Sequence, residues 1–80
     1  MKFILTMNMP SKSGREVHSM IVEHPSPSLK LFLEELEDCD FLIVDEYFVD
    51  NNNPGRPPEH RGEVAINYRF VGKVKEYKSR

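Results

Sequence analysis

One amphipathic segment restricts the folds open to this chain more than any other feature. After Ser26 and Pro27, apolar residues recur at the spacing i, i+3, i+4 and i+7, which is typical of a helix with one apolar face. A serine can cap a helix by accepting a first-turn N–H, and a proline fits the first helical position because it has no N–H to satisfy. The spacing predicts a helix over about residues 27–38. Its apolar face consists of Leu29, Phe32, Leu33 and Leu36.

The rest of the chain has the patterns of strands and turns. Alternation of apolar and polar residues, or runs of β-branched and aromatic residues, predicts strands. The segment 15–24 also fits helical spacing, but the turn-forming residues before it and the break after it favour a strand. The segment 40–50 is apolar on both faces, which predicts a central strand covered on both sides for part of its length. The predicted strands are 2–9, 15–24, 40–50, 63–67 and 73–77, the last two being separate strands or one long bent strand.

These elements predict an α+β protein with the order β-β-α-β-β-β. The 80 residues form a single domain, 1–80, because a chain of this length has room for only one core. We expect an antiparallel or mixed sheet of four to five strands with one helix on one face. The stretch NNNPGRPPEHRG, residues 51–62, contains three prolines, three asparagines and two glycines, which predicts a flexible loop without regular structure.

Acidic and basic residues are unevenly distributed. Residues 34–50 carry eight acidic residues and no base, whereas residues 56–80 carry seven bases and three acids. Several of the acids crowd the end of the predicted helix, where the helix dipole disfavours negative charge. Two interpretations stay open: the basic C-terminal strand neutralises these acids, in the same chain or in a neighbouring copy, or the acids form a solvated face that maintains solubility.

The basic C-terminal segment is the first candidate binding site. Aromatic and basic residues that alternate on a sheet can stack on bases and follow phosphates, or they can bind a protein partner. The overall pI of about 5.9 and the acidic segment argue against nucleic acid, since such proteins usually have a basic domain. The candidate residues are Tyr68, Arg69, Lys73, Lys75 and Tyr77.

The loop 51–62 is the second candidate site, because long loops in compact domains often carry function. Its acid–base candidates are Glu59, His60 and Arg61. The other two histidines do not form a site. In a strand, His18 and His24 would lie about 20 Å apart, too far to share one metal ion.

Cysteine chemistry and phosphate binding have little support. The single cysteine, Cys39, cannot form an intramolecular disulfide, and its acidic neighbours disfavour the thiolate. The segment 11–15 lacks the spacing of a phosphate-binding loop. We therefore expect no metal, no cofactor and no catalytic residues. A single cysteine also suits the reducing cytoplasm, and no apolar run approaches the roughly 20 residues of a membrane span.

The sequence favours a small non-catalytic interaction module, an oligomeric accessory or regulatory protein. The reason is that residues 41–49 offer more apolar surface than one helix can cover, so that a homodimer or a protein partner would cover the rest. The alternative is a nucleic-acid-binding protein that uses the C-terminal strand. A third hypothesis is a small enzyme with its site in the loop 51–62.

Overall fold

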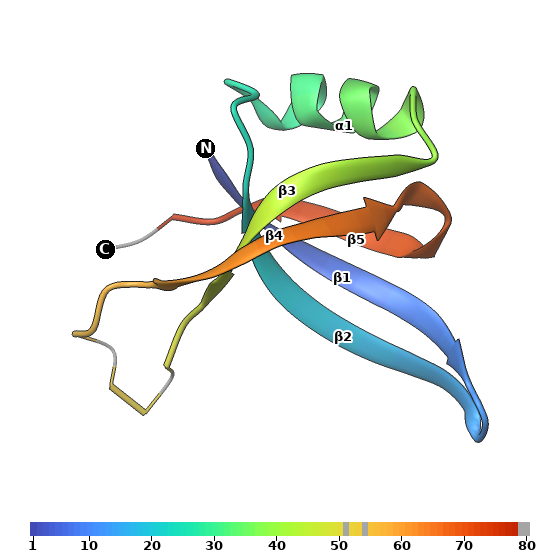
Figure 1. Cartoon of the computed structure of the whole chain (residues 1–80), viewed down its shortest axis with the longest axis horizontal. Coiled ribbons are helices and arrows are strands. Elements are labelled where there is room, and N and C mark those ends of the chain that lie inside the picture. Colours follow the sequence, from blue (N-terminus) through green and yellow to red (C-terminus); the bar gives the residue numbers. More distant parts are fainter. Residues whose placement is uncertain (51, 54, 79–80) are drawn as a thin grey trace.

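The structure is a computed structural model that describes residues 1–50, 52–53 and 55–78. The order of its elements, β-β-α-β-β-β, confirms the predicted α+β fold (Figure 1). The elements are β1 (Lys2–Ser11), β2 (Gly14–Glu23), α1 (Leu29–Glu37), β3 (Phe41–Phe48), β4 (Glu59–Asn67), the short 3-10 helix η1 (Tyr68–Phe70) and β5 (Val71–Glu76). Residues 51 and 54 of the predicted loop lie outside the described residues.

The five strands form one antiparallel sheet in the order β4-β3-β2-β1-β5. The sheet begins with a tight hairpin, in which Ser11 lies opposite Gly14 across a tip of two residues. Gly14 has a φ of 124°, a conformation that residues with a side chain rarely adopt. A glycine at this position therefore allows β2 to start directly after the tip.

The sheet must curl, because its two edge strands are consecutive in the chain. In a flat sheet, β4 and β5 would lie about 19 Å apart, four spacings of about 4.8 Å. Only η1 connects them, and the four peptide units from Asn67 to Val71 reach about 15 Å at most. The two edges therefore approach each other at this end, and the sheet encloses the core on its concave face.

The core contains side chains from four strands and from α1. The fully buried cluster is Phe3, Leu5, Met7, Val22, Phe32, Leu36, Val44 and Ile66. Partly buried side chains from η1 and β5 also pack against it, among them Phe70 and Val74. Since α1 contributes Phe32 and Leu36, the helix lies on the concave face of the sheet. The predicted apolar face of the helix is confirmed at these two residues and at Leu29, which packs against the cluster. Leu33 is only partly buried and belongs neither to the cluster nor to the residues packed against it.

The predicted start of the helix is wrong by two residues. The helix begins at Leu29, and its cap is Ser28, whose hydroxyl accepts a hydrogen bond from the Leu31 N–H at 3.2 Å. Ser26 cannot act as the cap, because its hydroxyl is buried and hydrogen-bonded to His24 and Glu35. Pro27 consequently lies outside the helix.

Two further predictions need correction. The strand β3 is not covered on both faces: Phe41 and Ile43 are 61% and 63% exposed, because α1, the only α-helix of the described chain, lies on the opposite face. The predicted loop 51–62 is also too long, since β4 already begins at Glu59. Strand pairing with β3 draws residues 59–62 into the sheet in spite of their turn-forming composition. None of the helices in the described residues is both long and apolar enough to cross a membrane.

Candidate functional site

One row of side chains crosses all five strands on the open, convex face of the sheet. Ile4 lies opposite Ile21 on one side and opposite Lys75 on the other, and Ile21 lies opposite Tyr47, which lies opposite His60. Side chains alternate between the two faces of a strand, and the neighbours Phe3, Leu5 and Val22 are buried in the core. The row therefore faces away from the core. From edge to edge it reads Lys75, Ile4, Ile21, Tyr47 and His60.

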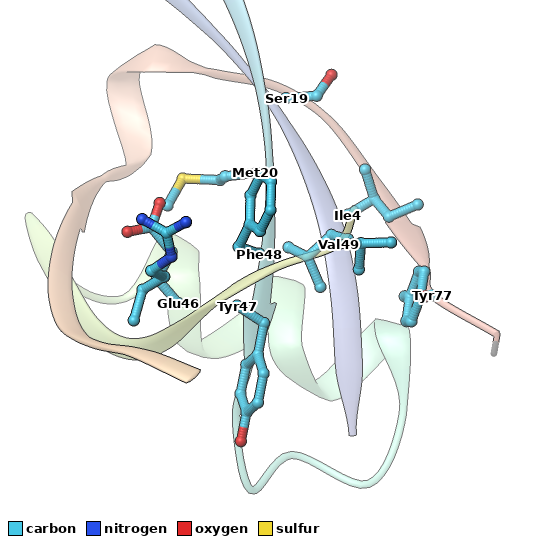
Figure 2. A pocket seen from close by; sticks show the side chains of 10 residues that line it. Ile4, Ser19, Met20, Glu46, Tyr47, Phe48, Val49 and Tyr77 are labelled. Atoms are coloured by element: carbon cyan, nitrogen blue, oxygen red, sulfur yellow. The ribbon is translucent and has the colours of Figure 1, made fainter. Parts of the chain in front are cut away.

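A groove opens beside the middle of this row, where β2 and β3 separate, and it is lined by residues from both faces of these strands. None of its lining residues belongs to α1. Its lining combines aliphatic, aromatic and polar side chains, which come from four strands and from the residues just beyond β3 and β5 (Figure 2). In Figure 2 the Tyr77 ring lies on the side of Ile4 and Val49, and the Phe48 ring lies on the side of Met20. The lining residues are Ile4, Ser19, Met20, Ile21, Glu46, Tyr47, Phe48, Val49, Arg61 and Tyr77.

Two cations lie over aromatic rings of the groove. Lys2 Nζ is 4.7 Å from the centre of the Tyr47 ring, and Arg61 Cζ is 4.6 Å from the centre of the Phe48 ring. Lys2 also forms an ion pair with Glu23 at 3.6 Å. Cation–π contacts at exposed sites contribute about 0.5–1 kcal/mol each. They help to hold Tyr47 and Phe48 in fixed orientations.

His60, the acid–base candidate from the sequence, lies at the end of the row in β4 and not in a loop. A bulge between Glu46 and Tyr47 in the pairing of β3 with β4 brings His60 opposite Tyr47, with ring centres 5.3 Å apart. Its Nε2 lies 3.0 Å from Asp45 Oδ1, and both side chains are about half exposed. Nucleophilic catalysis also needs a nucleophile within hydrogen-bond reach of the base. Within the described part of the chain, His60 forms no hydrogen bond with a hydroxyl or a thiol.

The other two residues of the predicted loop site also belong to β4. Glu59 lies opposite Phe48 at the start of the strand. Arg61 covers the Phe48 ring and lines the groove. Of the three residues of this predicted site, Arg61 lines the groove, whereas Glu59 and His60 lie beside it in β4.

The structure divides the basic and aromatic C-terminal candidates into two groups. Tyr77 lines the groove, Lys75 lies in its row, and Lys73 lies one row further along, opposite Thr6. Tyr68 and Arg69 belong to η1, at the other end of β5. The five residues therefore do not form one continuous surface.

The basic strand does not neutralise the acidic helix in the same chain. Lys73 and Lys75 are on the convex face, whereas α1 lies on the concave face, and the last turn of α1 contains no basic residue. Among the described residues, the one ion pair that involves a helix acid joins Glu35 to His24. The charge on Glu34, Glu37 and Asp38 stays exposed to solvent.

A polar network between β2 and α1 was not predicted from the sequence. His24 Nε2 lies 3.1 Å from Glu35 Oε2, and His24 Nδ1 lies 2.9 Å from Ser26 Oγ. The Ser26 hydroxyl also reaches Glu35 Oε2 at 3.3 Å, and the Ser26 N–H donates to His24 Nδ1 at 3.2 Å. Ser26 is only 5% exposed, so its hydroxyl is closed to a substrate. The network joins the end of β2 to the helix, and no spacing in the sequence predicted it.

The remaining candidates stay apart from one another. His18 lies opposite Met7 and pairs with Glu16 at 3.0 Å, whereas His24 exchanges backbone hydrogen bonds with Met1. The Cys39 thiol is half-buried at the end of α1 and donates to the Glu35 carbonyl at 3.1 Å. In the part of the chain that the structure describes, no group of three or more His, Cys, Asp or Glu side chains could hold a metal ion.

A second hollow opens on the concave side, at the end of the core that α1 does not cover. Its apolar lining includes Met7, Met9, Met20, Val64 and Phe70. Because α1 packs over Phe3 at the start of β1, Met9 near the other end of β1 is left 40% exposed. The hollow is thus the open end of the core.

Comparisons of this chain with models of protein families, with curated proteins and with solved structures found no match.

Proposed function

We propose that this chain is a small non-catalytic interaction module, and that its groove binds an extended peptide segment of a protein partner. The observation that carries the proposal is that Tyr47, Phe48 and Tyr77 line one groove, which opens where β2 and β3 separate. Grooves lined by aromatic side chains bind proline-rich segments in the extended polyproline II conformation, because this conformation is preformed and loses little conformational entropy on binding. An accessory or regulatory protein would use such a groove to recruit its target.

The charges around the groove favour a peptide with acidic residues next to its apolar anchors. Lys2 and Arg61 lie over two of the rings, and Lys75 extends the row at the β5 edge. Such cations would increase the rate of association with an acidic segment and contribute less to the affinity itself. The apolar residues Ile4 and Ile21 would supply most of the buried area.

A second candidate function is the binding of single-stranded nucleic acid. Tyr47 and Tyr77 lie in one groove, and Lys73 and Lys75 lie on the same sheet face, which resembles the combination of stacking rings and cations on which single strands bind. The net charge of −2 and the exposed acids of α1 make this function less favourable than peptide binding.

The test is to select peptides from a random library on the wild-type chain and to measure their affinity for variants. We expect Tyr47→Ala and Tyr77→Ala to weaken binding about tenfold or more, because each removes an aromatic anchor. Tyr68→Ala is the matched control, since Tyr68 is 42% exposed in η1, outside the groove. The proposal is wrong if no peptide is enriched, or if all three variants bind alike. Tyrosine-dependent binding of an oligo-dT strand, with a steep salt dependence, would instead favour the second candidate.

A further inference from the structure

Most of the β2 strand has a neighbour on one side only. β2 pairs with β1 along all ten of its residues, but with β3 only at Ile21, Val22 and Glu23. Figure 1 shows the cause: the hairpin of β1 and β2 runs away from the hairpin of β3 and β4 after the point where they meet. Residues 14–20 therefore form an open sheet edge in the described structure, and the side chains of residues 14–19 are exposed.

The hydrogen-bond pattern identifies which backbone groups are free at this edge. Met1 and His24 donate their N–H groups to each other's carbonyls, at 2.9 and 3.0 Å. In an antiparallel ladder, such bonded pairs recur at every second residue, so the even-numbered residues of β2 bond to β1. The N–H and C=O groups of the odd-numbered residues point to the other side. At the open edge these residues are Arg15, Val17 and Ser19.

The two outer strands of the sheet, β4 and β5, are better protected against pairing with another chain than the open edge of β2 is. Lysine side chains, prolines and bulges are features that prevent edge strands from pairing with other chains. β5 carries Lys73 and Lys75, whereas β4 follows two prolines and contains a bulge near Gly62, whose φ is 108°. The β2 edge contains no proline and no bulge against β1, and its charged residues have both signs.

We propose that this edge binds a second copy of the chain, in an antiparallel register centred on Val17 and related by a two-fold axis. In this register Val17 lies opposite the partner's Val17, and Arg15 lies opposite the partner's Ser19. Three pairs then exchange backbone hydrogen bonds, about six bonds in all. Glu16 lies opposite the partner's His18, and the two-fold axis makes this pair occur twice. Val17 is 65% exposed in the single chain, and it would pack against its own copy at the centre.

Charge complementarity selects this register over its neighbours. A shift to a centre at Glu16 places two carboxylates directly opposite each other, and a centre at His18 places two histidines together. Two carboxylates directly opposite each other destabilise a strand pair, and the register centred on His18 lacks the contact between Glu16 and the partner's His18. A register whose two-fold axis passes between two residues fails for another reason. Each odd-numbered residue of β2 then lies opposite an even-numbered residue of the partner, whose backbone groups already bond to its own β1. The Val17-centred register joins Arg15, Val17 and Ser19 of both copies and pairs Glu16 with the partner's His18.

The dimer edge and the groove share Ser19, but their tests use different residues, Glu16 and His18 for the dimer and Tyr47 and Tyr77 for the groove, so the two proposals can fail separately. The contact consists of one pair of strand edges, which is small compared with permanent interfaces, so we expect a dissociation constant in the micromolar range. The dimer would join two sheets in the order β1, β2, β2 of the partner and β1 of the partner. Two grooves would then lie on one particle, and a partner with two copies of the peptide would bind with higher avidity.

The experiment uses two charge variants of the full chain, Glu16→Lys and His18→Glu, and measures mass by sedimentation from low micromolar to submillimolar concentrations. His18→Glu places two carboxylates opposite each other, and Glu16→Lys removes the acceptor for the partner's His18 and places a cation there, so we expect self-association to weaken about tenfold or more. In an equimolar mixture the introduced lysine lies opposite the introduced glutamate and one Glu16–His18 pair is kept, so we expect the mixture to dimerise about as well as the wild type. Both variants lack the Glu16–His18 contact within one chain, so recovery in the mixture cannot come from that contact.

Glu34→Lys is the control, because it reverses the charge of an exposed residue on α1, away from the β2 edge, and should dimerise like the wild type. Circular dichroism melts of the diluted chains verify that all variants are folded. The inference is overturned if the wild type stays a 9.4 kDa monomer at every concentration. It is equally overturned if the single variants dimerise like the wild type, or if the mixture does not recover. A partner strand from a different protein would appear as a monomeric wild type, which counts against this proposal.

Discussion

The rings of Phe3 and Phe32 are stacked, with their centres 4.2 Å apart and their planes inclined by 12°. Both residues are fully buried, and they join the first strand of the sheet to the helix. His24 meets the edge of the Phe32 ring at 5.3 Å, next to its contacts with Glu35 and Ser26. The position of α1 on the sheet is therefore fixed by an apolar stack and by an adjacent polar network.

Replacing Phe32 by alanine should remove most of the stability of the fold. Loss of a buried phenylalanine costs about 3–5 kcal/mol, and stabilities of small domains are commonly near 5 kcal/mol. Chemical unfolding followed by circular dichroism measures the difference. Leu33→Ala is the matched control on the same helix, and it should cost clearly less because Leu33 is only partly buried. Equal losses in the two variants would show that α1 packs through a different face.

The helix cap gives a second prediction. Ser28→Ala should lower the free energy of unfolding by about 1 kcal/mol, because the Leu31 N–H loses its acceptor. Ser28→Asp should retain most of the stability, since a carboxylate accepts the same bond and suits the helix N-terminus. Thermal melts of the three chains test this order. A Ser28→Asp chain as unstable as Ser28→Ala would argue against capping at this position.

Glu34 and Glu35 are neighbours on α1 with different surroundings, which gives a third prediction. Glu35→Ala should cost about 1 kcal/mol, because His24 Nε2 and the Ser26 hydroxyl lose an acceptor. Glu34→Ala should be neutral or stabilising by a few tenths of a kcal/mol, since it removes an exposed acid from the helix. Urea unfolding of both variants provides the comparison. The network has no role in stability if both variants behave alike.

Asp50, just after β3, gives a prediction about pH. The Asn53 side-chain amide, at 2.8 Å, and the Asn52 N–H, at 2.9 Å, donate to its carboxylate and hold the pKa of Asp50 below its ordinary value. A lowered pKa means that these hydrogen bonds are complete above the ordinary aspartate pKa and are lost as the pH falls through the lowered one. In a carboxyl NMR titration, Asn53→Ala should move the midpoint of Asp50 upward. An unchanged midpoint would contradict the role of the Asn53 side chain.

Local patterns in the sequence determined the type and order of the elements. Helical spacing of apolar residues predicted α1, and alternation predicted β1, because these periods depend on residues a few positions apart. The same patterns placed Phe32 and Leu36 on the buried face of the helix. They failed at the helix start, where two serines are equally suited to capping and only the contacts of Ser26 with His24 and Glu35 exclude it.

The tertiary structure alone decided which strands are neighbours and which faces stay open. β4 and β5 follow each other directly, yet they form opposite edges of a curled sheet, and this arrangement depends on pairing over the whole chain. That pairing gathers Lys75, Ile4, Ile21, Tyr47 and His60 into one row, although they are distant in sequence. It also leaves Phe41 and Ile43 exposed, although the sequence predicts that their strand is covered on both faces. A periodic pattern shows that a face is apolar, but it does not show whether another element covers that face.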